Sequence, residues 1–365
     1  MSAMVGPAAV PARRPRGERL SQAWMLGGLA ALALLSAVLA AGIGAFHIPP
    51  AEVAAVLLHK LGLDTGIPFT VQQEAVLSAI RLPRVALALL VGAGLGAAGA
   101  AMQGLFRNPL ADPGLVGVSS GAALAASFVI VLGAKLLPDL YKALGIFMLP
   151  AAAFIGGLTV TLCIYTVSTR EGRVSLPVML LAGVAANALA LAGIGLLTYI
   201  ATDEQSRLLV FWSLGSLGGA NWQNVAICAP CVIFAVGLAW RFARPLNAIL
   251  LGEAEAGHLG INVTHLKAGV IGLCTLCVGA LVAFTGIIGF VGLVAPHMLR
   301  LACGPDHRVV IPGAALLGAV LTVAADVVAR TIVTPAELPI GILTTFIGAP
   351  FFMVLLMRQR GAWGA

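Results

Sequence analysis

The segment Pro245–Asn262, PLNAILLGEAEAGHLGIN, lies between two strongly apolar runs at 225–240 and 266–284. Each run is about long enough to cross a bilayer as a helix, which takes roughly 20 residues. The segment between them is polar enough to leave the membrane. This alternation predicts a polytopic, all-α membrane protein.

The pattern inside this segment predicts one short helix with a mixed face. The residues that recur at helical spacing are Leu250, Leu251, Ala254, His258 and Ile261. Glu253 and Glu255 lie on other faces, whereas lipid-surface helices favour Lys and Arg on their polar face. We therefore expect this helix to dock on a partner protein, with a solvated connecting helix as the alternative.

The composition excludes an ordinary soluble domain. The chain has 365 residues, of which 60% are hydrophobic and 10% charged, and its mean hydropathy is +1.04. Soluble domains carry about 25% charged residues.

The apolar runs divide the chain into a basic tail, a membrane domain and a short C-terminal tail. Residues 1–22 are arginine- and proline-rich and are predicted to be disordered, 23–357 form the membrane domain, and 358–365 form the C-terminal tail. Ten spans are predicted, at 23–46, 85–106, 114–133, 147–168, 177–200, 224–241, 265–285, 286–302, 309–329 and 340–357. The long join at 201–223 separates five spans from five, so the two halves are expected to be inverted repeats.

The distribution of positive charge orients these spans. With a cytoplasmic N-terminus, 14 of the 21 Lys and Arg fall on cytoplasmic segments and 7 on outer segments. This bias favours cytoplasmic N- and C-termini and places 245–262 in the cytoplasm. We interpret the net charge of +7 as this topology signal and expect no nucleic-acid partner.

Small residues within the second span predict tight helix packing. Gly92, Gly96 and Gly99 lie on faces where the backbone of a neighbouring helix can approach. In a membrane such contacts replace the hydrophobic driving force between helices.

Few residues indicate chemistry within the chain. Cys228-x-x-Cys231 and Cys274-x-x-Cys277 are spaced like zinc half-sites but lie inside apolar helices, so we interpret them as buried apolar residues. The chain has no Gly-Lys dipeptide and hence no Walker-type phosphate loop. We expect no catalytic, cofactor or metal site. Asp326 stands four residues before Arg330, so an i,i+4 pair accounts for it without a proton relay.

Several ordered blocks resemble the permeases of bacterial ABC importers for iron-siderophores, haem and vitamin B12. The blocks are Arg81-Leu-Pro-Arg84, Gly104–Gly114, Gly117–Gly121, Leu181–Val184, Gly289–His297, Asp306–Arg308 and Glu337–Gly341. The resemblance covers about residues 70–357. Within the family, Phe211–Trp222 is most similar to haem permeases.

The resemblance implies a permease subunit of the bacterial inner membrane that is not itself an enzyme. Its partners would be a second copy, two ATPase subunits that bind ATP and Mg, a periplasmic binding protein, and haem or another iron chelate as cargo. Ferric siderophore and cobalamin remain alternatives for the cargo. From other classes, an ion-coupled transporter and a membrane enzyme remain alternatives.

The resemblance also implies three functional regions. The helix region 245–262 would receive the ATPase stroke through Leu250, Leu251, Glu253, Ala254, Glu255, His258 and Leu259. A cytoplasmic gate would be formed by Asn108, Leu110, Leu176 and Pro177, although the last two replace the small polar pair of the family. Arg81, Arg84 and Arg330 would dock acidic residues of the binding protein at the outer face. Pro83 is expected in the first turn of its helix, which would place Arg84 at the positive end of the helix dipole.

Overall fold

The computed structural model describes residues 16–44, 46, 48–60, 62–333 and 336–363. The predicted all-α architecture is confirmed, apart from one two-stranded hairpin. The elements are α1 Arg16–Gly42, α2 Pro50–Lys60, α3 Val71–Val76, the π-helix η1 Leu77–Arg81, α4 Leu82–Phe106, the 3₁₀ helix η2 Pro113–Val116, α5 Val118–Phe128, the π-helix η3 Val129–Gly133, α6 Ala134–Leu136, α7 Pro138–Leu144, η4 Gly145–Phe147, α8 Met148–Ser168, β1 Thr169–Arg170, β2 Arg173–Val174, α9 Leu176–Ile200, α10 Asp203–Ser213, α11 Trp222–Arg241, α12 Ala243–Ile249, α13 Glu253–His258, α14 Val263–Thr285, α15 Val291–Cys303, α16 His307–Thr331 and α17 Ile340–Trp363.

The ten predicted spans all fall on apolar helices. In the described part of the chain, 8 helices are long and apolar enough to cross a membrane. The remaining two spans are shorter apolar helices, Val291–Cys303 and Ile340–Val354. The tail prediction is wrong in part, because α1 already begins at Arg16; residues 1–15 lie outside the described residues.

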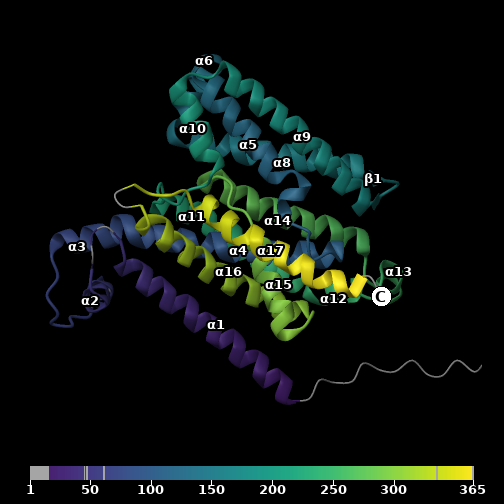
Figure 1. Ribbon diagram of the computed structural model, residues 1–365, viewed down its shortest axis with the longest axis horizontal. Coiled ribbons are helices and arrows are strands. Elements are labelled where there is room, and N and C mark those ends of the chain that lie inside the picture. Colours follow the sequence, from purple (N-terminus) through teal and green to yellow (C-terminus); the bar gives the residue numbers. More distant parts are fainter. Residues whose placement is uncertain (1–15, 45, 47, 61, 334–335, 364–365) are drawn as a thin grey trace, which may run out of the picture.

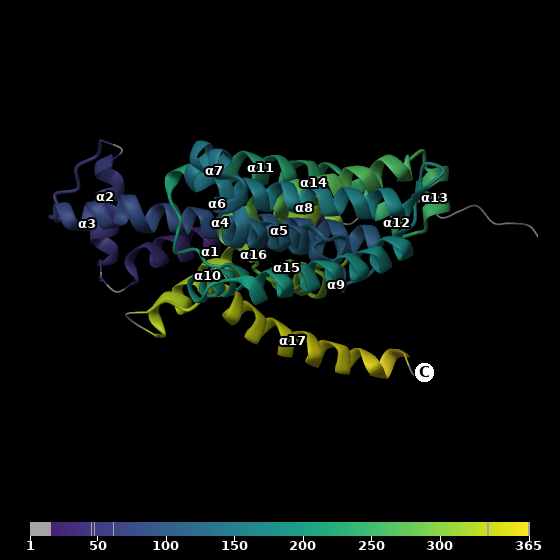
Figure 2. The ribbon, with the colours of Figure 1, turned by 90° about the horizontal axis from the view of Figure 1, so that it is seen from above.

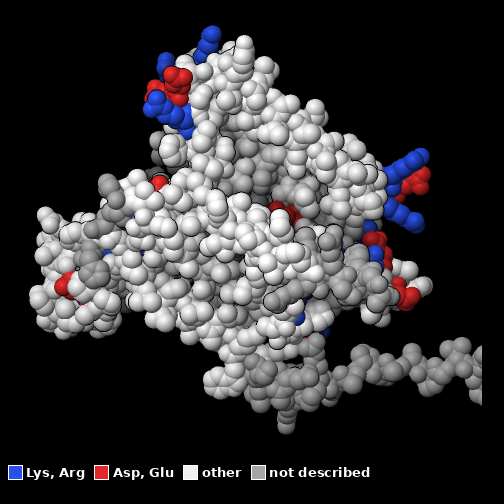
Figure 3. All heavy atoms as spheres, in the orientation of Figure 1, with Lys and Arg blue, Asp and Glu red and all other residues white. Residues whose placement is uncertain are grey.

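The helices run roughly along one axis, with charged groups at the two ends. Figure 1 shows α2 and α3 at one end and α13 with β1 at the other. Figure 2 shows α17 along one side of the bundle. In the view of Figure 3, Lys, Arg, Asp and Glu gather over α6 and α10 and beside β1 and α13, and the surface between these groups is largely uncharged. Such a band is expected of a protein that faces lipid between two polar interfaces.

Helix α4 lies in the centre of the bundle, and its glycines explain why. A Cβ on Gly92 would overlap the carbonyl oxygen of Gly318 in α16, and one on Gly96 would overlap that of Ala314. Gly99 meets the carbonyl of Gly292 in α15 in the same way. The predicted close-packing role of these glycines is confirmed. Because α4 packs mainly on α16, α11 and α15, the two halves of the chain do not form separate bundles.

The second span begins earlier than predicted. A capping box of Thr70 and Gln73 starts α3 at Val71, and one continuous helix runs from there to Phe106. Pro83 therefore lies inside this helix, where it lacks an N–H and would crowd the preceding turn. The π turn Leu77–Arg81, in which the Leu82 N–H bonds to the Leu77 carbonyl, precedes it and widens the helix there. Pro83 is in the first turn of α4, as expected. The expectation that Arg84 lies at the positive end of a helix dipole is wrong, because α4 continues a helix that begins at Val71.

Candidate functional site

The segment predicted to be one helix folds as two. Gly252 has φ +129° between α12 and α13, a backbone conformation that strongly favours glycine and breaks the helix. Leu246, Ile249 and Ala256 face the protein body and are buried. The predicted coupling residues that face outward are Leu250, Leu251, Ala254, Glu255, His258 and Leu259. This outward set of residues is the coupling surface.

Glu253 differs from the other predicted coupling residues. Its carboxylate Oε2 lies 2.8 Å from Lys267 Nζ, and the Lys267 side chain is only 6% exposed. The same ammonium donates a 3.0 Å hydrogen bond to the carbonyl of Val174 in the β hairpin. Lys267 of α14 therefore joins the hairpin to Glu253 of α13, and Glu255 is the carboxylate on the coupling surface.

A second set of hydrogen bonds joins α12, which precedes the coupling surface, to α16. Asn247 of α12 donates to Asp306 Oδ1 at 2.7 Å and accepts from the His307 backbone N–H at 2.9 Å. Asp306 also caps α16 through the Arg308 N–H at 3.0 Å. Sequence reasoning did not identify Asn247 or Lys267 as functional. The one signal available in the sequence was Asp306, which is a typical N-cap residue. A displacement of α12 and α13 would therefore be transmitted to α14 through Lys267 and to α16 through Asn247.

The predicted gate turn follows the inner end of α4. Arg107 ends the helix with φ +49°, and the Asn108 N–H returns to the Gln103 carbonyl at 3.2 Å. The Asn108 side chain accepts the Leu110 N–H at 2.9 Å, and Leu110 is 41% exposed. Leu176 and Pro177 form the first turn of α9, half-buried and exposed respectively.

The chain after this turn does not stay at the surface but enters the helix bundle. A Cβ on Gly292 would lie 3.1 Å from the Leu95 carbonyl and 3.5 Å from Asp112 Oδ2. Leu95 stands eleven residues before the end of α4, which is about 16 Å along a helix. The segment 107–117 is therefore re-entrant. Non-helical backbone at such depth is tolerated where protein or a cavity surrounds it.

Two matching triplets meet at this re-entrant segment. Gly114-Leu115-Val116 follows Asp112-Pro113, and Gly292-Leu293-Val294 lies in the first turn of α15. Asp112 and Pro113 lie beside Gly292. The paired triplets support the inverted repeat, which stays a prediction. They also draw attention to Asp112, a half-buried acid between the second and third predicted spans.

The three predicted docking arginines are not exposed at a rim. Arg81, Arg84 and Arg330 are only 5–7% exposed. Arg330 donates to the Ala40 carbonyl at 2.6 Å, and Arg81 donates to the carbonyls of Ala41 and Gly42 at 2.8 Å each. Arg81 and Arg330 are buried at the end of α1 because the last carbonyl groups of that helix have no partner within the helix.

Arg84 has the strongest ion pairs of this group. Its Nε lies 2.9 Å from Asp326 Oδ1, and its Nη1 lies 2.9 Å from Glu337 Oε1. Arg330 Nε is 3.5 Å from Asp326 Oδ2, so the predicted i,i+4 partner of Asp326 is the more distant one. These five residues, Arg81, Arg84, Asp326, Arg330 and Glu337, form the outer ion cluster, in which the Glu337 side chain is 47% exposed.

The paired cysteines lie in helix packing. Cys228 and Cys274 are buried and donate weakly to the carbonyls of Ala280 and Ala98. His297 of α15 is buried, and its Nε2 has no hydrogen-bond partner in the described part of the chain.

Comparison with known proteins places this geometry in a family. The model of the FecCD transport family matches residues 32–358. The chain belongs to the FecCD transport family. It is 48% identical to the hemin transport system permease protein HmuU of Yersinia pestis, over 77% of this chain and 83% of that protein. It is 39% identical to the cobalamin import system permease protein BtuC of Halobacterium salinarum, over 84% of this chain and 79% of that protein.

A solved structure of a metal-chelate-type ABC transporter in an inward-facing conformation has the same fold. The TM-score is 0.79 at 32% identity, covering 92% of this chain and 99% of that one. The FecCD chain is therefore an ABC importer permease for haem, vitamin B12 or an iron chelate. It is not an enzyme, because ATP hydrolysis resides in a separate subunit. This membership removes the ion-coupled transporter and the membrane enzyme from the alternatives.

Proposed function

We propose that this chain is the membrane subunit of an ATP-driven haem importer. The observation that carries the proposal is the 48% identity to a haem permease, against 39% to a cobalamin permease. The aromatic stretch Phe211–Trp222 supports the same cargo. The subunit would work as a homodimer in the bacterial inner membrane, with two ATPase subunits that bind ATP and Mg, a periplasmic binding protein, and both termini cytoplasmic.

The arrangement of the two ends supports alternating access. At the inner end the coupling surface would receive the ATPase movement and pass it to α14 and α16 through Lys267 and Asn247. The gate turn at Asn108 and Leu110 would then part from its copy across the twofold axis, with Leu176 and Pro177 nearby in the dimer. At the outer end, docking of the binding protein on Arg84 would require an acidic side chain to displace Glu337.

The cargo is tested by titrating the periplasmic binding protein of the same system with haem, ferric siderophore and cobalamin. We expect haem to bind most tightly, by at least about tenfold, which corresponds to 1.4 kcal/mol. Tighter binding of ferric siderophore or cobalamin would reassign the cargo while leaving the importer class unchanged.

Ala254→Arg is expected to uncouple the transporter. The exposed Ala254 on α13 would face a cleft of the ATPase, and an arginine there would clash with the cleft wall. The complex should keep docking its binding protein but lose cargo-stimulated transport, measured in proteoliposomes. Ala75→Arg, an exposed alanine on α3 at the opposite end, is the matched control. Normal transport by the Ala254→Arg complex would refute the coupling role.

Leu110→Cys is expected to crosslink to its copy in a state-dependent way. In a twofold dimer the gate turn meets its mate, so a short bifunctional crosslinker should join the two cysteines in one nucleotide state and much less in another. The unmodified chain with its native cysteines is the background, and Leu251→Cys on the coupling surface is the control. Equal crosslinking in every nucleotide state, or none, would reject this gate assignment.

A further inference from the structure

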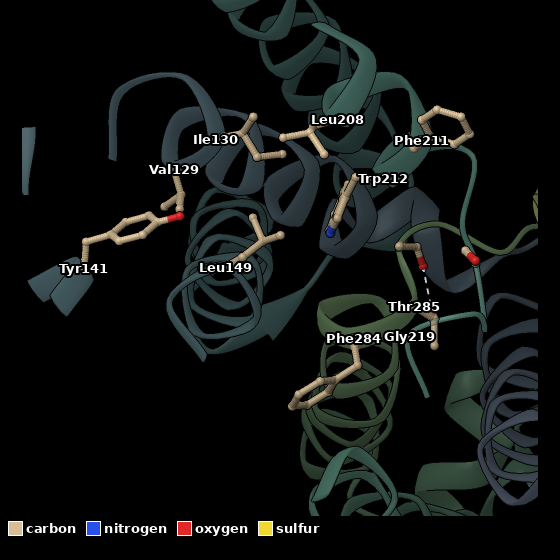
Figure 4. A pocket seen from close by; sticks show the side chains of 12 residues that line it. Val129, Ile130, Tyr141, Leu149, Leu208, Phe211, Trp212, Gly219, Phe284 and Thr285 are labelled. Atoms are coloured by element: carbon tan, nitrogen blue, oxygen red, sulfur yellow. Dashed lines mark hydrogen bonds between the residues drawn. The ribbon is translucent and has the colours of Figure 1, made fainter. Parts of the chain in front are cut away.

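A pocket of about 380 Å³ opens at the end of the molecule opposite the coupling surface. Its aromatic lining comes from separate elements: Tyr141 of α7, Phe211 and Trp212 of α10, and Phe284 of α14. Figure 4 shows the Trp212 indole projecting into the middle of the pocket, with Leu149 on one side and Thr285 on the other. We refer to it as the outer pocket.

Helix α10 crosses the outer pocket and is attached at both ends. Near its start, Gln205 donates to the carbonyls of Ile130 and Val131 at 3.2 Å each. These carbonyls belong to the π turn η3, and π turns inside α-helices occur frequently at functional sites. After its end, the Ser216 N–H bonds to the Thr285 carbonyl at 2.7 Å, and the Gly341 N–H at the start of α17 bonds to the Leu214 carbonyl at 3.0 Å.

These attachments connect the pocket to the rest of the bundle. A group seated against α10 would press on η3, on the end of α14 and on the start of α17. Occupancy of the outer pocket would therefore be transmitted to helices that reach the inner end, where α14 meets the coupling surface through Lys267.

The lining suits a flat, largely apolar ring. Small-molecule sites are mostly apolar and aromatic with a few polar groups, in volumes of about 300–1,000 Å³. The outer pocket lies at the lower end of that range, so it would take one edge or face of a macrocycle and leave the rest outside. Its lining residues include no histidine, cysteine or methionine, and Tyr141 is the lining side chain that could ligate ferric iron.

A cation near the pocket adds charge complementarity. Arg207 is exposed on α10, one helical turn before Phe211. An arginine pairs well with a carboxylate. Haem carries two propionates on a planar ring, whereas the corrin ring of cobalamin carries amides.

Building on the proposed function, we propose that the outer pocket is a reception site for haem, with the porphyrin against Trp212 and Phe211 and a propionate on Arg207. The site would hold the cargo between its release from the binding protein and its passage inward. Stacking on aromatic side chains contributes affinity without a coordinate bond.

The test is a haem titration of the permease–ATPase complex in lipid nanodiscs, followed by the Soret difference spectrum against empty nanodiscs. Trp212→Leu should weaken haem binding by about tenfold, while Trp212→Phe should keep it within about threefold because stacking is preserved. Arg207→Glu should weaken haem binding and leave binding of the propionate diester of haem unchanged. Trp240→Leu, which changes an exposed tryptophan at the inner end, is the control.

The outcomes separate this inference from the proposed function. If the wild-type complex transports haem but Trp212→Leu and Arg207→Glu bind it as tightly as wild type, the pocket assignment is overturned and the haem importer stands. If the wild-type complex neither binds nor transports haem, both are overturned. Weaker binding by both variants, with Trp212→Phe and Trp240→Leu near wild type, supports the assignment.

Discussion

Gly96→Leu is expected to prevent accumulation of the folded permease. The glycine lies where α4 crosses α16, and any Cβ there would overlap the Ala314 carbonyl, a backbone atom that cannot rotate away. Overpacking costs about 1–3 kcal/mol where side chains can adjust, and more where backbones must separate. We expect loss of the monodisperse protein by size-exclusion chromatography in detergent, with only aggregate remaining.

Gly195→Leu is the matched control for this change. Gly195 is also inside a membrane helix, α9, but nothing lies within 4 Å of a Cβ built there. It should therefore yield folded protein near wild-type levels. Equal yields of the Gly96→Leu and Gly195→Leu proteins would contradict the central packing of α4.

Arg84→Met is expected to be the most destabilising single change in the outer ion cluster. It keeps most of the side-chain volume but leaves Asp326, whose side chain is 2% exposed, with only the more distant Arg330. Breaking a buried ion pair by removing one partner costs about 3–5 kcal/mol. The measurement is the fraction of monodisperse protein after heating in detergent, compared with Arg170→Met on the exposed hairpin.

A double variant distinguishes the loss of the Arg84–Asp326 ion pair from a general loss of packing. Asp326→Leu combined with Arg84→Met removes both charges, so it should lose less stability than the sum of the two single variants. A strictly additive loss would contradict direct coupling between Arg84 and Asp326.

The spans and the coupling segment could be predicted from sequence because they depend on composition and short-range pattern. Ten apolar runs mark ten helices, and the break at Thr285-Gly286 coincides with the end of α14. The polar segment 245–262 differs clearly from its apolar neighbours. Leu250, Leu251 and Leu259, which were predicted to contact a partner, are exposed. Its division into α12 and α13 depends on the conformation of Gly252, which composition does not reveal.

The burial of charge could not be predicted in this way. Arg81, Arg84 and Arg330 are hydrophilic and lie near span ends, so pattern alone places them at an interface. Their burial depends on partners distant in sequence: the end of α1 for Arg81 and Arg330, and Glu337 for Arg84. The same limit applies to Glu253, whose partner Lys267 becomes visible only once α13 folds onto α14.

The re-entrant segment 107–117 was missed for a related reason. Its prolines, asparagine and aspartate are typical of a surface turn. Its entry into the bundle depends on Gly183 of α9, where any Cβ would overlap the Leu115 carbonyl of this segment.

The most direct test of the haem-importer account is uptake by proteoliposomes that contain this permease and its ATPase, with ATP and an apo-haem-binding reporter inside and the loaded binding protein outside. The account predicts ATP-dependent accumulation of haem, with little accumulation of cobalamin or ferric siderophore presented by the same binding protein. Accumulation of cobalamin or ferric siderophore, with no ATP-dependent entry of haem, would contradict it.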